Sequence, residues 1–256
     1  MKIKITGIGS YIPEKKISNT DFSEHVFLNE DGSPFAYPNE VVINKFKGIT
    51  GIEKRRYAED SYTASDLAFF ASQKAIENAG IDPETLDYII FAHNFGDVKF
   101  GTTQSDIIPS LATRVKHQLQ IKNPKCVAYD ILFGGPGWIE GVLQANAFIK
   151  SGMEKKCLVI GGETLSRVVD AHDRDSMIYS DGAGASVIEA SDDETGMLSY
   201  ESATYAAEEA NFLYFGKSYN PDLDPDTKYI KMYGRKIYEF ALSQVPAAMK
   251  SCLDQS

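Results

Sequence analysis

The chain opens with hydrophobic and polar residues in alternation. Residues 2–9 place Ile between Lys or Thr, and this period of two predicts a half-buried strand. The overlapping segment Gly7–Pro13 is interpreted as a turn at which the strand ends. A dinucleotide-binding loop would need a third glycine at position 12, which is Ile. Residues 20–50 show neither the strand period nor the helix period and are expected to be irregular.

Apolar residues next recur at helical spacing. They form one stripe from Leu67 to Ala79, Thr63 can cap the start of the helix, and Gly80 can end it. The same reasoning predicts a strand at 88–93, a helix at 107–119, a buried strand at 126–129, a helix at 139–149 and a strand at 156–160. Strand and helix therefore alternate through the first 160 residues, which indicates an α/β fold with a largely parallel sheet covered by helices.

A glycine-rich stretch, residues 130–138, runs from a predicted strand into a predicted helix. Pro136 suits the first helical position, because it has no N–H to leave unpaired there. Gly134, Gly135 and Gly137 remove side chains where the backbone must approach another group closely. The free N–H groups and the dipole of the helix start favour a negative charge, so a thiol placed there would have a lowered pKa. A nucleophile is expected at such an elbow, yet the elbow holds no Ser, Cys or Thr.

The later part of the chain has weaker periodicity. A turn at Asp181–Gly184 is expected to support the elbow helix from beside it and to lead into a strand. Further elements are expected as a strand at 198–205, a loop-rich segment at 211–227 and a long helix at 233–253, which Pro246 can kink.

Composition narrows the function classes. The net charge of -10 and the pI near 4.9 argue against a protein that binds the nucleic-acid backbone. The sequence contains no run of 18 apolar residues, so no transmembrane helix is expected. The N-terminus is interpreted as a strand instead of a signal peptide. The three cysteines are too scattered for a disulfide framework, so a cytoplasmic location is expected.

Several specific sites find no support in the sequence. A metal site would be indicated by Cys-x-x-Cys or by paired His residues, and the sequence contains neither pattern. No cofactor is expected. A P-loop would need Gly-Lys-Ser/Thr after a glycine cluster, and an α/β-hydrolase would need Gly-x-Ser-x-Gly; neither pattern occurs.

An ordered set of short motifs carries a family resemblance. The motifs are Gly7–Pro13, Thr50–Ile52 followed by Arg55–Arg56, Asp130–Gly137, Gly161–Arg167, Asp173–Arg174 and Asp181–Ala185. Together they resemble the ketoacyl-acyl carrier protein synthase III branch of the thiolase-like condensing enzymes, over nearly the whole chain. The resemblance implies an α/β, thiolase-like fold of α-β-α-β-α layers, made of two similar halves and usually assembled as a homodimer. Residues 1–190 would form the N-terminal half with the elbow, and residues 191–256 the beginning of the C-terminal half.

The resemblance also implies an acyltransferase that makes a carbon–carbon bond by decarboxylative Claisen condensation. In that family a cysteine at the elbow is acylated, and a His and an Asn from the second half assist the decarboxylation of malonyl-acyl carrier protein. The expected partners are an acyl-CoA or acyl-acyl carrier protein and malonyl-acyl carrier protein, in fatty acid or polyketide biosynthesis. No nucleic acid and no membrane is expected as a partner.

The family's functional positions can be carried onto this sequence. The nucleophile position is Gly135, which has no side chain to accept an acyl group. Phe133, Gly134 and Pro136 would lie against the substrate, and Arg174 matches a family arginine near the CoA entrance. The family also clamps the CoA adenine with a Trp placed before Thr-Gly-Ile, where this sequence has none.

Two hypotheses about Gly135 stay open at this point. The His and Asn motifs are expected beyond the long helix, and the sequence ends at Ser256 before they appear. The chain is either an enzyme of the family with an introduced Cys-to-Gly change, or a natural silent subunit of a heterodimeric condensing enzyme. Its expected assembly is a homodimer or a heterodimer with a condensing enzyme. Both hypotheses predict that the chain is inactive in condensation.

Other residues with reactive side chains are interpreted as structural. Cys126 lies in an apolar run and is expected to be a buried, inert thiol. His93 ends a predicted strand and is expected to be held by hydrogen bonds. Glu163 and Arg167 are expected to pair with the Asp173–Arg174 dipeptide.

Overall fold

The computed structural model describes residues 2–193 and 196–256, and the chain forms two compact units. The first unit consists of Met1–Ile17, Arg55–Arg167 and Ser180–Gly196, and the second of Ser18–Lys54, Val168–Tyr179 and Met197–Ser256. The segments of the two units alternate along the sequence. The division into halves at residue 190 stays a prediction.

The first unit is built on a five-stranded sheet in the order β1, β9, β8, β4, β7. The strands are β1 (Lys2–Tyr11), β4 (Tyr88–His93), β7 (Val127–Leu132), β8 (Lys156–Thr164) and β9 (Asp181–Ser191). Strands β8, β4 and β7 are parallel, whereas β9 is antiparallel to both β1 and β8. The α/β fold is confirmed, but the sheet is mixed and not largely parallel. Only the short 3₁₀ helices Leu165–Arg167 and Arg174–Ile178 join β8 to β9, so the helical crossover typical of parallel neighbours is missing there.

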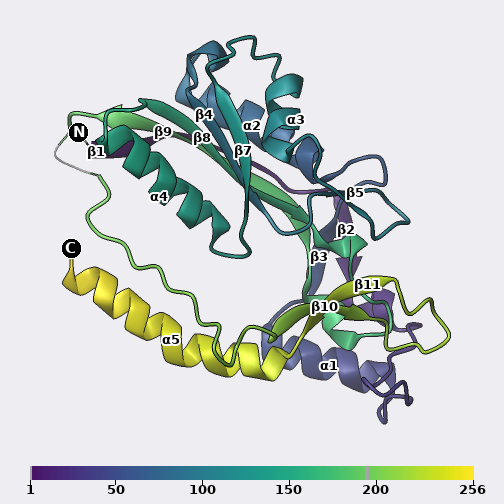
Figure 1. Ribbon diagram of the computed structural model, residues 1–256. Coiled ribbons are helices and arrows are strands. Elements are labelled where there is room, and N and C mark those ends of the chain that lie inside the picture. Colours follow the sequence, from purple (N-terminus) through teal and green to yellow (C-terminus); the bar gives the residue numbers. More distant parts are fainter. Residues whose placement is uncertain (1, 194–195) are drawn as a thin grey trace. The chain divides into compact units, whose positions relative to one another are not determined.

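Helices cover both faces of this sheet (Figure 1). Helices α2 (Ala64–Ala79) and α3 (Leu111–Gln118) lie on one face, and α4 (Gly137–Lys150) lies on the other. The main core lies between α2, α3 and the sheet and includes the buried side chains of Leu67, Ile89, Phe91, Leu111 and Leu158. The unit is therefore an α-β-α sandwich whose parallel strands end near the start of α4.

The helix predicted at 63–80 is confirmed as α2. Thr63 and Asp66 form a capping box at its start, and Gly80 ends it with a φ of 65°. The stripe of alanines on α2 allows the helix to approach the sheet closely. A Cβ atom added at Gly9 would lie 2.2 Å from the carbonyl oxygen of Ala71, and one at Gly7 would lie 2.2 Å from that of Ala75.

These contacts correct the interpretation of Gly7–Pro13 as a turn. β1 continues through Tyr11 and pairs with β9 as far as Ala183. The glycines allow a helix to lie directly against the strand, a role that a period-two pattern along the strand does not indicate.

The helix predicted at 107–119 begins later than expected. α3 starts at Leu111, and Ser110 caps it by accepting a hydrogen bond from the N–H of Thr113 at 3.2 Å. Ile107 and Ile108 precede Pro109, and a residue before proline disfavours the helical conformation. They belong instead to a loop between β4 and α3, in which the two-residue strands β5 (Asp97–Val98) and β6 (Ser105–Asp106) pair.

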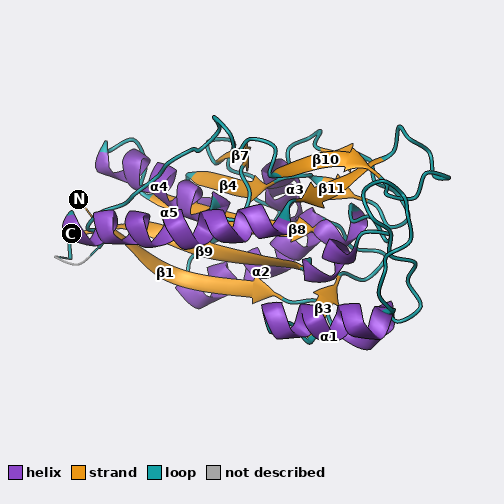
Figure 2. Cartoon of the chain, turned by 90° about the horizontal axis from the view of Figure 1, so that it is seen from below, coloured by secondary structure: helices purple, strands orange, loops and turns teal. Residues whose placement is uncertain are grey.

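The second unit contains helix α1 (Asn39–Thr50), strands β10 (Leu213–Lys217) and β11 (Lys228–Met232), and helix α5 (Gly234–Asp254). The antiparallel β10–β11 ribbon leads directly into α5 (Figure 2). The long helix predicted at 233–253 is confirmed, with Pro246 inside it.

The remaining short elements of the chain are strands β2 (Lys15–Ser18) and β3 (Lys54–Tyr57) and the 3₁₀ helices Asn19–Phe22 and Pro83–Thr85.

Three expectations for the second unit are wrong or incomplete. Residues 39–50 form a helix and are not irregular; the Asn39 side chain anchors its start to backbone carbonyl oxygens, which a pattern of apolar positions does not reveal. Residues 198–205 form no strand, and the loop-rich segment 211–227 contains β10. The apolar residues of 198–205 include Leu198, Tyr200 and Tyr205, which are exposed, so no sheet partner organises them.

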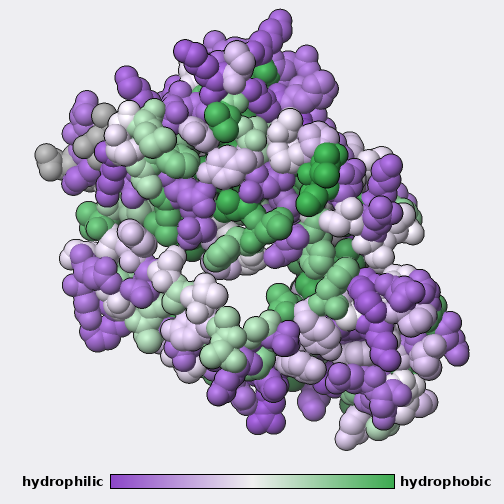
Figure 3. Space-filling model, in the orientation of Figure 1, coloured by the Kyte–Doolittle hydropathy of each residue, from purple (hydrophilic) through white to green (hydrophobic). Residues whose placement is uncertain are grey.

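Hydrophobic side chains also reach the surface of the face drawn in Figure 3. None of the described helices has both the length and the apolar character needed to cross a lipid bilayer.

Candidate active site at the elbow between strand and helix

The predicted elbow is present between β7 and α4. Leu132 ends β7, and the N–H of Gly137 donates to the carbonyl oxygen of Gly134 at 2.8 Å, closing a turn just before the helix. Pro136 occupies the N-cap position, one residue before the expected one, and α4 starts at Gly137. Residue 135 thus lies just before the N-terminus of α4, where the helix dipole favours a negative charge.

The strand that leads to the elbow is not buried as expected. β7 pairs with β4 only, among the described strands, and therefore lies at the edge of the sheet. Val127 is 44% exposed and Leu132 is 66% exposed. Apolar residues on this edge strand gave the sequence signature of a buried strand, because a pattern cannot tell a buried position from an exposed apolar edge.

The three elbow glycines differ in their surroundings. A Cβ atom at Gly137 would lie 2.7 Å from the Cβ of Ala92, so the close approach expected from the sequence is real at this position. A Cβ at Gly134 would lie 3.4 Å from Oδ1 of Asn94, an ordinary contact. A Cβ at Gly135 would meet no atom within 4 Å, so close approach does not explain this glycine.

Gly135 is also exposed and does not have a positive φ. The backbone at this position therefore accommodates any L-residue. A cysteine side chain would fit there without displacing a neighbour, next to the first turn of α4.

The ends of the parallel strands form the floor beneath the elbow. Side chains alternate between the two faces of a strand. Ala92 of β4 contacts the elbow at Gly137, and a Cβ at Gly161 of β8 would lie 3.3 Å from the Cβ of Trp138 on α4. Glu163 lies two residues further along β8, on the same face as Gly161, and Asn94 follows the end of β4 in a bend.

Glu163 is a half-buried carboxyl group on this floor. One carboxylate oxygen accepts a hydrogen bond from the backbone N–H of Asn94. Burial raises the pKa of Glu163 to about 7, although the Asn94 N–H and His93 act in the opposite direction. The carboxyl group therefore changes charge near neutral pH.

His93 is held between two backbone segments, as expected for a structural histidine. Its Nδ1 accepts a hydrogen bond from the N–H of Gly96 at 3.0 Å, so the proton lies on Nε2, which is 3.0 Å from Oδ2 of Asp130. Asp130 in turn accepts the N–H groups of Leu111 and Ala112 at 2.7 and 2.8 Å. This network joins β4 and β7 to the start of α3.

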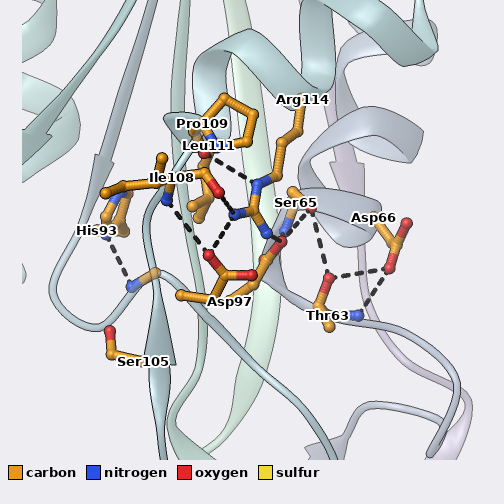
Figure 4. Close-up of polar contacts among 12 residues, drawn as sticks. Thr63, Ser65, Asp66, His93, Asp97, Ser105, Ile108, Pro109, Leu111 and Arg114 are labelled. Atoms are coloured by element: carbon orange, nitrogen blue, oxygen red, sulfur yellow. Dashed lines mark hydrogen bonds and ion pairs between the residues drawn. The ribbon is translucent and has the colours of Figure 1, made fainter.

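Arg114 fixes the loop between β4 and α3 (Figure 4). Its guanidinium lies 2.7 Å from Oδ2 of Asp97 and 2.7 Å from Oδ1 of Asp106, and it also donates to the carbonyl oxygens of Ile108 and Pro109. Asp97 itself accepts the N–H and the hydroxyl of Ser65 at the start of α2. Sequence reasoning missed Arg114, because its partners are scattered and form no motif.

Asp181 does not have the expected role beside α4. It starts strand β9 instead of a turn, and its carboxylate accepts the N–H of Ala58 at 2.7 Å and the hydroxyl of Ser166 at 2.6 Å. Burial raises its pKa. The Asp181–Gly184 motif therefore belongs to the sheet and to the loops on its α2 side, because alternating small residues suit a tightly paired strand.

The partners expected for Glu163 and Arg167 also differ in the structure. Glu163 bonds to Asn94, and Arg167 donates to the carbonyl oxygen of Glu59 at 2.9 Å and lies 5.0 Å from the ring centre of Phe100. Backbone acceptors leave no trace in a pattern of charges, so sequence reasoning favoured an ion pair instead.

Comparison with known proteins decides the family. Residues 129–206 match the family model described as 3-oxoacyl-[acyl-carrier-protein (ACP)] synthase III. The chain is 32% identical to β-ketoacyl-[acyl-carrier-protein] synthase III 1 of Halalkalibacterium halodurans over 253 residues, which cover 98% of this chain and 70% of that protein. The chain belongs to the β-ketoacyl-acyl carrier protein synthase III family.

Solved structures agree with this assignment. The 3-oxoacyl-[acyl-carrier-protein] synthase III from Aquifex aeolicus VF5, known from a crystal structure, is 31% identical to this chain. The two structures match with a TM-score of 0.78, and the match covers 99% of this chain and 71% of that chain. The priming β-ketosynthase of the R1128 polyketide pathway is 24% identical, with a TM-score of 0.75, and the match covers 96% of this chain and 68% of that chain. At that identity the likeness shows the fold alone. The thiolase-like fold expected from the sequence is confirmed. The family is one of condensing acyltransferases of fatty acid or polyketide biosynthesis.

Arg174, the arginine that the synthase III resemblance places near the CoA entrance, lies in the second unit. Its guanidinium is half exposed and lies 4.8 Å from the ring centre of Phe35. Asp173, just before it, is buried and lies 3.2 Å from Nζ of Lys231. Sequence reasoning missed Phe35 because it looked for a Trp directly before Thr50.

The cysteines of this synthase III homologue do not replace a nucleophile at the elbow. Cys126 is buried, and burial raises its pKa to about 11. Cys157 is buried in β8, and burial raises its pKa to about 12. The expectation of a buried, inert Cys126 is confirmed, since a thiol with so high a pKa gives little thiolate at neutral pH. Cys252 on α5 is partly exposed.

Proposed function

We propose that residue 135 is the nucleophile position of a synthase III reaction and that, with glycine there, this chain does not form an acyl-enzyme. The observation that carries the proposal is the open space at Gly135, at the start of α4. A cysteine fits at this position, whereas glycine has no atom that can be acylated. The substrates of the complete reaction would be an acyl-CoA or acyl-acyl carrier protein, with malonyl-acyl carrier protein as the second substrate.

The elbow suits the acylation step for a physical reason. A thiol at residue 135 would face the free N–H groups at the start of α4, which stabilise its thiolate. The thiolate attacks the carbonyl carbon of an acyl thioester and a new carbon–sulfur bond forms. The bond to the carrier thiol breaks, and the released thiolate takes up a proton. Phe133, Gly134 and Pro136 surround residue 135 in the chain and would line the space that the acyl group enters.

Arg174 and Phe35 support the binding of CoA in this proposal. The resemblance implies that an arginine and an aromatic ring hold the adenine, and no Trp is available before Thr50. The Arg174–Phe35 pair supplies a cation and an aromatic surface at one place, and both can contact a planar ring.

Isothermal titration calorimetry of the unmodified chain with an acyl-CoA tests this binding mode, and the measurement does not need the nucleophile. Arg174→Ala is expected to weaken binding about tenfold, since a cation–aromatic contact contributes about 1 kcal/mol and the phosphates lose a cation. Arg235→Ala is the control, because Arg235 is exposed on α5 and pairs with Glu239. Equal affinity of the two variants would contradict the assigned role of Arg174.

A silent subunit is the second candidate, and the same Gly135 favours it. Such a subunit would bind an active condensing enzyme, whereas an enzyme with an introduced change would pair with its own copy. Reading codon 135 in the unmodified gene separates the two candidates: a cysteine codon would eliminate the silent subunit. Co-expression with an intact synthase from the same genome, followed by affinity purification of this chain, would reveal a heterodimer.

A further inference from the structure

The floor beneath the elbow contains a polar pair that the condensation reaction does not account for. The pair consists of Asn94, just after β4, and Glu163, near the end of β8. Ala92 and Gly161 lie opposite each other in the parallel pairing of β4 and β8, and both contact the elbow or the first turn of α4. Glu163 lies two residues further along β8, on the same face as Gly161, and Asn94 follows the end of β4 in a bend.

Asn94 connects the pair to the elbow directly. Its side-chain oxygen is the nearest atom to a Cβ placed at Gly134, at 3.4 Å, and its side-chain nitrogen follows at 3.7 Å. The backbone N–H of Asn94 donates to Oε1 of Glu163. Glu163 is therefore linked through Asn94 to the space beside Gly134, next to position 135.

Glu163 differs from two buried acidic groups that a cation neutralises, whereas Asp181 resembles it in being held by N–H and hydroxyl groups. Asp97 is paired with Arg114, and Asp170 is paired with Lys231. Within residues 2–193 and 196–256, no Lys or Arg forms an ion pair with Glu163, and its hydrogen bonds come from amides. A half-buried carboxyl group without a cation is a costly way to fix a loop, because burial disfavours its charged form.

We propose that Glu163 and Asn94 form a positioning pair that would control the ionisation and the orientation of a thiol placed at residue 135. This inference rests on the proposed role of residue 135. Glu163 does not touch the reacting atoms; it acts through Asn94 and through its charge. In the ionised state Glu163 holds the Asn94 N–H and repels a thiolate on the elbow. In the protonated state the repulsion is absent, so the thiolate forms more readily.

The charged groups around Glu163 fix the direction of this effect. Burial raises the pKa of Glu163 to about 7, and the hydrogen bond from the Asn94 N–H acts in the opposite direction. Asp181 of β9 pairs in register with Thr164, but its carboxylate binds Ala58 and Ser166, and Glu140 lies in the first turn of α4. Between pH 6 and 8 Glu163 therefore passes from neutral to anionic, and the apparent pKa of a neighbouring thiol should rise over the same interval.

The experiment uses the full chain with two substitutions, Gly135→Cys to install the thiol and Cys252→Ser to remove the partly exposed one. Cys126 and Cys157 are buried and remain unreactive. The rate of alkylation by iodoacetamide is measured from pH 5.5 to 9.5. The parent variant is expected to give a profile with two ionisations, one near 7 from Glu163 and one from the thiol. A profile with a single ionisation overturns the proposal and needs no further variant.

Glu163→Gln then assigns the lower ionisation. It is expected to remove that step and to lower the apparent pKa of the thiol by about one unit, the size expected for removing a nearby charge at an effective dielectric constant near 20. Glu154→Gln is the matched control, because Glu154 is also a carboxyl group with a raised pKa but precedes the opposite end of β8. Glu163→Asp, which keeps the carboxyl group, should retain two steps. Equal effects of Glu163→Gln and Glu154→Gln overturn the proposal.

Asn94→Ala tests the connection to the elbow. It is expected to change the alkylation rate at high pH, where the thiol is fully ionised, because the elbow loses the side chain that contacts Gly134. An unchanged limiting rate would show that Asn94 does not orient residue 135. Alkylation requires no acyl donor, so these results are independent of the acylation test of the proposed function. If the alkylation profile shows two steps but acylation fails, residue 135 is rejected as the acyl acceptor. If acylation succeeds but the alkylation profile shows a single step, the Glu163–Asn94 pair is rejected.

Discussion

At the scale of single residues, Arg114 shows how strongly one partly buried cation can organise the surroundings of the elbow. Its guanidinium serves two carboxylates and two carbonyl oxygens of the loop that runs from β4 to α3. Asp97 is nearly inaccessible, and removal of Arg114 would leave its carboxyl group without its cationic partner. Loss of one partner of a buried pair is more harmful than loss of an exposed pair, because the other charge stays desolvated.

Arg114→Ala is therefore expected to lower the free energy of unfolding of the first unit by about 3 kcal/mol. Urea denaturation monitored by circular dichroism measures the change. Lys4→Ala serves as the control in the same unit, because Lys4 pairs with Asp193 at 3.2 Å with both side chains largely exposed. The control should change stability by less than about 1 kcal/mol. Similar losses for both variants would contradict the importance given to burial.

At the scale of secondary-structure elements, close packing of helices on the sheet depends on a few glycines. Gly9 of β1 allows α2 to lie against the strand, and Gly141 of α4 allows contact with Val159 of β8 on the other face. Each of these positions lacks room for a single added carbon, so the spacing of the layers is set by the sequence of the strands and helices themselves.

Gly9→Ala is expected to destabilise the protein by about 2 kcal/mol, the cost typical of overpacking, because the new Cβ would lie 2.2 Å from a backbone oxygen of α2. Gly184→Ala is the matched substitution, since a Cβ there meets no atom within 4 Å and Gly184 lies in β9 of the same sheet. Thermal unfolding of both variants measures the difference. A loss at Gly184 as large as that at Gly9 would rule out the packing argument.

The elements also show what the sequence could and could not predict. The capped helix α2 and the elbow into α4 were predictable, because capping residues and hydrophobic period act locally. The start of α1 was not, since Asn39 binds carbonyl oxygens some 14 to 17 residues away. The same limit applies at the site: the proposed nucleophile position follows from a motif, whereas the roles proposed for Phe35 and Asn94 depend on contacts that form only on folding.

At the scale of the whole molecule, the edge of the sheet suggests how copies assemble. β7 has one strand neighbour among the described residues, and it carries exposed apolar side chains at Val127 and Leu132. An apolar edge strand readily pairs with a second strand, because its backbone groups on that side lack partners within the sheet. The homodimer implied by the family resemblance would use this edge.

Leu132→Lys is expected to shift the protein from dimer to monomer, because it places a charge on the edge that a second copy would cover. Sedimentation velocity at micromolar concentration measures the two species. Ile49→Lys is the control, since Ile49 is 72% exposed on α1, away from β7 in the sequence and outside the sheet. A monomeric unmodified chain, or equal dissociation by both variants, would contradict assembly through β7.

The central claim concerns residue 135, and acylation of an installed thiol tests it most directly. The chain with Gly135→Cys and Cys252→Ser is mixed with a series of acyl-CoAs, and its intact mass is measured beside that of the chain with Cys252→Ser alone. The account predicts a mass gain of one acyl group that maps to residue 135 in the first protein and no gain in the second. No gain with any acyl-CoA or acyl-acyl carrier protein, or acylation of the protein that keeps Gly135, would contradict it.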